Sequence, residues 1–349
     1  MRYIKIFIVG FLFIVIVQAG ILTYLDKVYL ADNATYSSVK VPDVVPSKTE
    51  TSKPKLTIVQ GGTDITASCD GKYISYMKGS VLNILDSDNA ESITVPAEDG
   101  MTIAYYKWIY DRNRLILAER PVSSKKAAYY KFYYYDVDSR STAEIYDEVN
   151  NKEVQIPEYN NEKISEIDMS TLTNLIYVKV TNSSAQSKIY RINIMAQENE
   201  VKTVTSHIGR IVSAKKTDKL FYQNSTSNEV FKQGSNSPVL IDGHTNLSLL
   251  GIDDKDNVYL ALTNKGMTKE IYYGSVSGSK WNRVDIATAV DFSNVFVNFN
   301  GSIYIRDNGQ SMVYELSTGN KTSFQGEIIG IYGSEIISKQ GNEIIKTPF

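Results

Sequence analysis

The sequence predicts an all-β fold preceded by one N-terminal transmembrane helix. The chain has 349 residues, and a strand–turn–strand pattern of similar length recurs through most of it. Tyrosine, which favours strands, occurs 25 times. After the N-terminal apolar segment we find no long amphipathic segment at helical spacing, so the remaining elements are expected to be strands.

The segment 246–264 shows the repeating unit most clearly. Its first part, Leu247 to Gly251, and its last part, Val258 to Leu262, have the composition of strands. Between them lies a run of Asp, Lys and Asn residues at 253–257. Asp and Asn favour turns because their short side chains bond nearby backbone and tolerate positive φ. The unit is therefore predicted to be two antiparallel strands joined by a tight turn.

Seven segments resemble the second strand of this unit, and each follows a polar turn. Most lie about 33 to 45 residues apart, and a third and usually a fourth strand follow each one. Four antiparallel strands per repeat of this length predict a blade of a β-propeller. We therefore expect seven four-stranded blades, with six or eight as the alternatives. The seven segments are Lys72–Tyr76, Arg114–Ala118, Leu175–Lys179, Lys219–Tyr222, Val258–Ala261, Ser302–Ile305 and Glu335–Ser338.

The two ends of the propeller are expected to share one blade. The C-terminal segment 327–349 supplies about three strands, and the segment 55–60 (KLTIVQ), which precedes the first copy, can supply the fourth. Such closure removes the open sheet edges of the ring and gives a propeller that spans 55–349. Fourth strands of other blades are expected at Ser92–Val95, Thr142–Tyr146, Val201–Thr205, Val239–Ile241 and Arg283–Ile286, and the polar segment Asn150–Glu162 is expected to be a long loop.

The string GIDDKDNVYLAL, at 251–262, resembles the repeat signature of NHL-, TolB- and quinoprotein-like propellers. In that signature a Gly, an Asp-rich turn and a strand of the NVYLA type recur. The resemblance implies a propeller architecture and no particular activity, because propellers include both enzymes and passive binding platforms. The whole chain also resembles single-anchor exported proteins of Gram-positive bacteria in its composition and its lack of disulfides.

The apolar segment Ile4–Leu25 is long enough to cross a bilayer as a helix. Arg2 and Lys5 lie at its start, while an adjacent Asp and Lys cancel each other just after it. This positive-inside bias predicts that residues 1–3 are cytoplasmic and that the rest of the chain is outside the membrane.

Cleavage of this segment is the alternative. Val17-Gln18-Ala19 fits a small-residue cleavage site, and cleavage near Ala19 would release the rest of the chain as a secreted protein. We favour the uncleaved anchor because the apolar run continues to Leu25. Residues 26–54, which carry three prolines among polar residues, are predicted to be a flexible linker under either interpretation.

Composition argues against several functional classes. The net charge of −2 does not predict a nucleic-acid partner. The single cysteine, Cys69, cannot form an intrachain disulfide, and two histidines, His207 and His244, are too few to predict a zinc site or a catalytic triad. The Asp-rich turn 253–257 lacks the Gly and Glu of an EF-hand loop, so we expect a turn there, with calcium as the alternative. We therefore predict no catalytic, cofactor-binding or metal-binding set.

Aromatic residues form the most unusual stretch after the apolar segment. Alternate side chains of a strand face opposite sides, so one set would pack between blades and the other could form an exposed surface that binds protein or glycan. Packing between blades is the interpretation that the pattern favours. The candidates for the exposed surface are Tyr105, Trp108, Tyr130, Tyr133, Tyr135 and Tyr159.

These observations predict a membrane-anchored, extracytoplasmic propeller that acts as a non-catalytic binding or scaffolding module for a protein or a cell-wall glycan. The first alternative is an exported hydrolase or lyase that acts on envelope polysaccharide or peptide at the propeller channel. It requires carboxylates that converge with aromatic residues at one mouth of the ring. The second alternative is the outer subunit of a sensory or envelope complex.

Overall fold

The computed structural model describes residues 17–18, 54–122, 128–159 and 161–349. The predicted cytoplasmic stub, nearly all of the predicted anchor Ile4–Leu25 and nearly all of the predicted linker 26–54 therefore lie outside the described residues. Within the described ranges, no helix is both long and apolar enough to span a bilayer. All of the sheets lie in the compact unit formed by residues 53–349.

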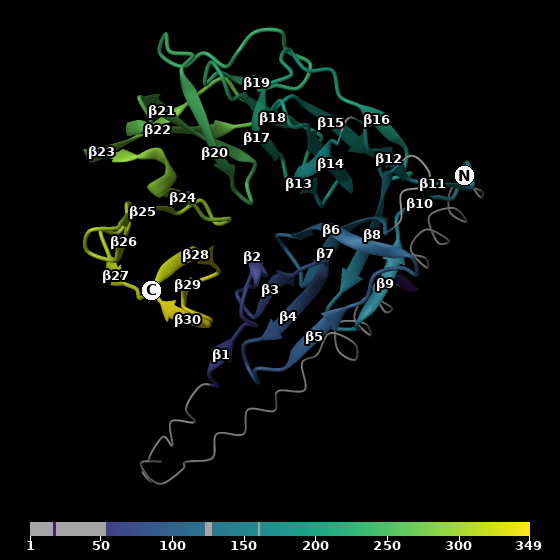
Figure 1. Cartoon of the computed structure of the whole chain (residues 1–349). Helices are drawn as coiled ribbons and strands as arrows, with labels where there is room; N and C mark the ends of the chain where they lie inside the picture. Colours follow the sequence, from purple (N-terminus) through teal and green to yellow (C-terminus); the bar gives the residue numbers. More distant parts are fainter. Residues whose placement is uncertain (1–16, 19–53, 123–127, 160) are drawn as a thin grey trace, which may run out of the picture. The chain divides into compact units, whose positions relative to one another are not determined.

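In the part of the chain that is described, seven antiparallel sheets form the blades of a β-propeller around a central axis, as Figure 1 shows. The first strand of each blade faces that axis. These first strands, in blade order, are β2 (Thr63–Ala67), β6 (Met101–Trp108), β13 (Lys163–Ser170), β17 (Ile208–Ser213), β20 (Leu247–Ile252), β24 (Val295–Val297) and β28 (Glu327–Tyr332).

The second strand of each blade lies in the middle of its sheet, and these strands coincide with the seven predicted segments. Most of their residues are buried because each middle strand has a neighbouring blade on both faces, which favours continuous apolar sequence. They are β3 (Tyr73–Lys78), β7 (Arg114–Pro121), β14 (Leu175–Thr181), β18 (Leu220–Asn224), β21 (Asn257–Asn264), β25 (Ile303–Asp307) and β29 (Glu335–Gln340).

The third strands complete the regular part of each blade. They are β4 (Val81–Asp86), β8 (Tyr129–Asp136), β15 (Ser187–Ile192), β19 (Val230–Lys232), β22 (Met267–Ser275), β26 (Met312–Glu315) and β30 (Glu343–Pro348). Outermost strands follow in four blades as β5 (Ser92–Val95), β16 (Glu198–Glu200), β23 (Asn282–Asp291) and β27 (Lys321–Ser323). A short 3-10 helix, η2 (Phe292–Asn294), joins blades 5 and 6.

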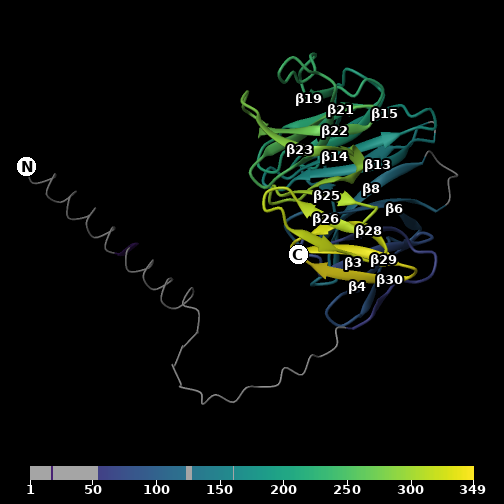
Figure 2. The same cartoon turned by 90° about the vertical axis from the view of Figure 1, so that its left-hand side faces the viewer.

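Blade 7 combines the two ends of the propeller. Its outermost strand is β1 (Leu56–Thr57), which pairs antiparallel with β30, and Figure 2 shows β28, β29 and β30 side by side. Leu56 and Ile58 are buried in the cluster between blades 7 and 1. The ion pair between Lys55 and Glu343 is exposed, so it contributes little to this closure. Apolar packing and backbone pairing therefore hold the first and last segments together.

The outermost positions of blades 2, 3 and 4 differ from the prediction. In blade 2, β9 (Ser141–Glu144) and β12 (Gln155–Pro157) pair with opposite ends of β8, and the hairpin of β10 (Tyr146–Asp147) and β11 (Lys152–Glu153) lies between them. The predicted loop 150–162 thus contains strands. The predicted strand 201–205 lies just after β16, and the predicted strand 239–241 forms only an isolated bridge.

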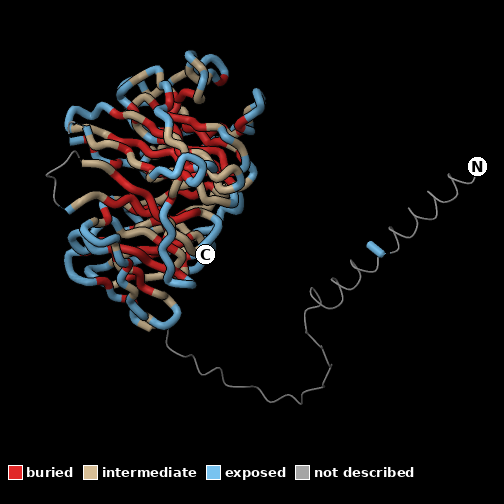
Figure 3. Tube along the Cα trace, turned by 90° about the vertical axis from the view of Figure 1, so that its right-hand side faces the viewer, coloured by how far each residue is buried: buried red, intermediate tan, exposed pale blue. Residues whose placement is uncertain are grey.

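The core of the propeller lies between neighbouring blades. Figure 3 shows buried residues along the strands and exposed residues in the turns at the periphery. Tyr130 packs with aliphatic side chains of blade 3 in the cluster between blades 2 and 3. Tyr133 and Tyr135 belong to the cluster between blades 1 and 2. Both faces of β8 are therefore covered by neighbouring blades.

Candidate functional site in the central channel

The first strands of all seven blades enclose a cavity of about 470 Å³ at the centre of the ring. This volume falls within the range of small-molecule sites. Charged side chains enter the lining only from blades 2, 3 and 4 among the described residues, and they are Lys107, Glu166, Asp168, Arg210 and Lys215. The cavity is the candidate functional site because it combines charge with an apolar and aromatic wall.

Bulges in the first strands direct side chains into this cavity. In the described part of the chain, the pairing of first and second strands shifts register in six blades. In β17 the shift falls between Ile208 and Ile211, so Arg210 is an unpaired bulge residue. A bulge re-aims the side chains around it. Leu250 of β20 and Ile329 of β28 occupy the corresponding bulges and also line the cavity.

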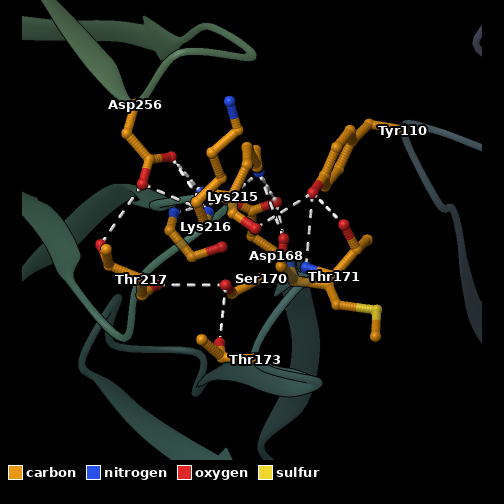
Figure 4. Close-up of polar contacts among 11 residues, drawn as sticks. Tyr110, Asp168, Ser170, Thr171, Thr173, Lys215, Lys216, Thr217 and Asp256 are labelled. Carbon is orange, nitrogen blue, oxygen red and sulfur yellow. Dashed lines mark hydrogen bonds and ion pairs between the residues drawn. The ribbon is translucent and has the colours of Figure 1, made fainter. Parts of the chain in front are cut away.

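Asp168 and Lys215 form an ion pair that joins blades 3 and 4 (Figure 4). The Lys215 Nζ lies 2.9 Å from the Asp168 Oδ1, and the Ser213 N–H donates to the same carboxylate at 2.6 Å. Burial by itself would raise the pKa of Asp168, but Lys215, Lys107 and the Ser213 N–H outweigh it and hold that pKa below its ordinary value. Asp168 is therefore a carboxylate at neutral pH.

Glu166 forms a second junction between the same blades. Its Oε2 accepts hydrogen bonds at 3.0 Å from the Lys179 Nζ and at 3.0 Å from the Ile211 N–H. Lys179 also donates to the Gly209 carbonyl of β17. Each channel carboxylate thus binds one lysine and accepts a hydrogen bond from a backbone N–H of blade 4. This arrangement positions blade 4 against blade 3.

The Asp-rich turn 253–257 has a structural role, and it also links blade 5 to blade 4 by hydrogen bonds. Asp253 accepts hydrogen bonds from its own turn and from the Tyr259 hydroxyl, whereas Asp256 accepts from the backbone of Lys215 at 2.5 Å and of Lys216 at 3.2 Å. Asp256 has φ 60°, as expected for a turn residue that tolerates positive φ. Figure 4 shows Asp256 facing Lys215, Lys216 and Thr217 of the neighbouring blade, and no metal-binding cluster occurs among the residues described.

Aromatic residues cover the mouth of the channel on the side of these turns. The Tyr110 ring of blade 2 packs against the Phe299 ring of blade 6, with their centroids 4.5 Å apart. The Lys215 Nζ lies 4.7 Å from the Tyr110 ring centroid, which is a cation–π distance. The Tyr110 hydroxyl contacts the Thr171 Oγ1. The contact between blades 2 and 6 therefore partly closes this mouth.

Two further cations of the channel lining are exposed, Lys107 of β6 and Arg210 of β17. The channel carboxylates pair with other lysines, Glu166 with Lys179 and Asp168 with Lys215, and no ion pair among the described residues uses Lys107 or Arg210. Lys107 still contributes to the low pKa of Asp168. With Lys179 included, four cations surround two carboxylates in and beside the channel, which leaves an excess of positive charge.

The six aromatic residues expected from the sequence occupy three different environments. Tyr105 and Trp108 line the channel, and the Trp108 Nε1 donates to the Ser75 Oγ at 2.7 Å. Tyr130, Tyr133 and Tyr135 are each at most 5% exposed, so they belong to the inter-blade core and not to an exposed binding surface. Tyr159 is 54% exposed and lies beside Lys188. The structure does not bring the six together.

The charged channel residues were not singled out from the sequence. Glu166 and Asp168 alternate with Ile167 in β13, and this alternation only indicates a strand with one polar face. Lys107 lies among aromatic residues that the sequence did highlight. A predicted first strand with charged residues on one face is the signal that could have marked the channel, because a first strand faces the propeller axis.

The chemistry of the channel suits recognition of an anion better than acid catalysis. Asp168 is held ionised, and Glu166 is bound to a lysine and a backbone N–H. Burial raises the pKa of Tyr105 to about 12, with smaller contributions from Glu166 and Asp168, so its hydroxyl stays neutral and can donate. His207 and His244 are exposed in loops outside the lining.

No protein-family model matches the chain, and no curated protein matches it. Solved structures resemble it at low identity. A chain of a mitotic checkpoint complex has a TM-score of 0.48 and 9% identity over 81% of this chain and 87% of that one. One of two prolyl endopeptidases gives 0.49 and 15% over 74% and 41%. TolB from Acinetobacter baumannii gives 0.40 and 12% over 82% and 62%. These identities transfer no activity or partner to this chain.

Proposed function

We propose that the protein is a membrane-anchored, extracytoplasmic propeller that acts as a non-catalytic binding or scaffolding module for a protein or cell-envelope glycan. The apolar segment Ile4–Leu25 and the linker that follows it support the location. The closed ring supports the role, because its seven blades hold a central cavity between rigid strands. The module also fits the outer part of a larger envelope complex.

The bonds made by the two channel carboxylates, Glu166 and Asp168, are the main support for a non-catalytic role. A hydrolase or lyase at the channel would use one carboxyl as a proton donor and a second as a base or nucleophile. Glu166 and Asp168 do lie near aromatic residues, as that alternative requires. Each is engaged by a lysine and by a backbone N–H of the next blade, so both are used to hold blades together.

A two-part experiment tests this proposal. A tagged full-length protein is cross-linked on intact cells with a membrane-impermeant reagent, and the enriched partners are identified against an untagged control. One reproducible partner or bound glycan supports the module. Recovery of abundant bystanders alone, or absence of any surface cross-linking, contradicts it.

The second part tests for catalysis with the same protein. Purified cell-wall polysaccharide and wall peptides are incubated with the wild type and with Glu166→Gln, and soluble products are measured by chromatography coupled to mass spectrometry. We expect no product above that of the buffer control. Product release by the wild type that is lost in Glu166→Gln would overturn the non-catalytic assignment.

A further inference from the structure

We propose that the central channel binds a small organic carboxylate, with Arg210 as the residue that pairs with its charged group and Lys107, deeper in the channel, as a second cation that attracts it. This inference deepens the proposed binding function and rests on it, because it assigns a ligand class to the same cavity. Three features carry it: the balance of charge, the two-sided wall and the chemistry of the donors.

The excess of cations over carboxylates in and beside the channel favours binding of an anion. Lys215 and Lys179 are matched by Asp168 and Glu166, and each of these four groups has a partner within 3.0 Å. Arg210 and Lys107 remain as exposed cations of the lining for which the described residues supply no carboxylate within ion-pair distance. In a recess walled by protein, such cations attract an anion more strongly than they would on an open surface.

The opposite wall is apolar, which favours an anion that also carries an aliphatic or aromatic group. Blades 5, 6 and 7 contribute Ile252, Val297 and Ile331 to the lining, together with the ring of Phe296. Tyr105 adds an aromatic face with a neutral hydroxyl on the charged side. An aliphatic or aromatic group can pack on this wall while its charged end meets the cations.

The available donors favour a carboxylate over a phosphate. Phosphate sites commonly use clusters of backbone N–H groups at helix N-termini or in Gly-rich loops. Here the described channel wall consists of strands and not of helix N-termini, and the backbone N–H groups of Ile211 and Ser213 already donate to Glu166 and Asp168. The guanidinium of Arg210 presents a planar pair of N–H groups that matches a carboxylate.

The mouth opposite the Tyr110–Phe299 contact is the route of access. The turns between first and second strands surround the mouth that these rings partly cover. Arg210 is the third of the 6 residues of β17, whereas Lys107 is the seventh of the 8 residues of β6 and lies closer to the turn of its blade. A ligand from the opposite mouth would reach Arg210 first and Lys107 deeper in the channel.

Calorimetric titration of the purified full-length protein tests the inference with matched probes. Phenylacetate carries the charge and the ring, phenylacetamide keeps the shape without the charge, and phenyl phosphate replaces the carboxylate. We expect phenylacetate to bind at least ten-fold more tightly than phenylacetamide, because a charge-assisted hydrogen bond contributes about this factor. Tighter binding of phenyl phosphate than of phenylacetate would overturn the choice of carboxylate.

Matched variants locate the site. Arg210→Gln should weaken phenylacetate binding about ten-fold, and its melting temperature should stay near that of the wild type because Arg210 forms no ion pair with the described residues. Lys107→Gln should weaken binding less than Arg210→Gln and should lower the melting temperature slightly, because Lys107 helps to hold the pKa of Asp168 low. Lys202→Gln, which removes an exposed cation after β16 at the outer edge of blade 3, should leave binding unchanged. Equal affinity in all three variants would place the probe outside the channel and overturn the inference.

The outcomes separate this inference from the proposed function. A surface partner captured from intact cells, together with no phenylacetate binding, overturns the ligand class and leaves the binding module standing. Phenylacetate binding that depends on Arg210, together with release of wall products, supports the anion site and overturns the non-catalytic assignment.

Discussion

The two halves of the channel wall differ in what their first strands carry. Blades 2, 3 and 4 supply all five charged residues of the lining among the residues described, whereas blades 5, 6, 7 and 1 supply uncharged residues, most of them aliphatic or aromatic. Blades 3 and 4 meet through the Asp168–Lys215 ion pair and the bond from the Ile211 N–H to Glu166. Blades 5 and 6 meet through an apolar cluster that includes Leu250 and Val295. Similar blades are therefore joined by two different kinds of contact.

The charged residues of the lining therefore fall into two groups: those that hold neighbouring blades together and those that face the cavity without an ion-pair partner. A buried carboxylate needs a partner, and its partner fixes the position of the next blade. In the charged half, Asp168 and Glu166 hold blade 4 in this way, and the remaining cations, Lys107 and Arg210, face the cavity. In the apolar half no such requirement exists, so that wall can pack against an apolar group.

Asp168→Asn should give the largest effect on stability. The amide oxygen can still accept from the Ser213 N–H, but Lys215, whose side chain is 8% exposed, loses its counter-charge. Breaking a buried pair costs roughly 3 to 5 kcal/mol, and the 16% exposure of the Asp168 side chain reduces this to about 2 kcal/mol. Urea unfolding followed by circular dichroism measures the loss.

The matched control lies in the apolar half. Ile252→Val removes one methylene from a buried residue of β20 and should cost about 1 kcal/mol. If Asp168→Asn destabilises the protein no more than Ile252→Val does, the charged half does not hold its blades by ion pairs.

The stability supplied by Asp168 should also depend on pH. Its pKa is lower in the folded protein than in the unfolded chain, so the unfolded state binds protons more readily and stability falls as the pH falls. The contribution is complete above about pH 5 and declines from about pH 4 down through the folded-state pKa. The difference in Tm between the wild type and Asp168→Asn should therefore shrink between about pH 6 and about pH 3. A difference that stays constant over this range would show that the ionised carboxyl is not the cause.

The fold could be predicted from the sequence because the middle strand of each blade is buried on both faces. β7 and β14 contain the buried apolar runs Leu115–Ala118 and Leu175–Val178, which stand out next to a polar turn. The outermost strands carry no such signal. No residue of β16 is buried, and the fourth strand of blade 3 was predicted at 201–205, just after it. The segment 239–241 predicted for blade 4 contributes only an isolated bridge.

The site was only partly predictable. The concentration of aromatic residues selected Tyr105 and Trp108 of β6, which line the channel, and it also selected Tyr130 and Tyr135 of β8, which are core residues. The pairing of Asp168 with Lys215 joins residues that are 47 positions apart in the sequence. Such a pair depends on the register between two blades, and single-sequence patterns contain no information on that register.

Tyr110→Phe tests the contact that links the two halves of the channel. The variant keeps the ring against Phe299 and beneath the Lys215 cation, but it removes the hydroxyl that contacts Thr171. Loss of one such hydrogen bond should lower the unfolding free energy by about 1 kcal/mol. Phe299→Leu, which keeps the hydroxyl and loses the aromatic pair, should cost a similar amount, roughly 0.5 to 1.5 kcal/mol. Thermal unfolding of both variants measures these losses; no change in either would mean that the rings do not hold the mouth.

Gly251→Ala should give the smallest effect, and it tests whether the apolar half has free space. A Cβ at Gly251 would meet the Val297 Cβ at 3.8 Å, which is an ordinary van der Waals contact, and the backbone there does not need positive φ. At Gly330, also a channel residue just after a bulge, a Cβ would lie 2.8 Å from the Tyr332 Cε2. We expect Gly251→Ala to change the unfolding free energy by less than about 0.5 kcal/mol, because any gain from a less flexible unfolded chain is small. Gly330→Ala should cost about 1 to 3 kcal/mol by overpacking. Equal losses in the two variants would mean that the wall beside Val297 is closely packed, and the apolar half would then have no room for a ligand.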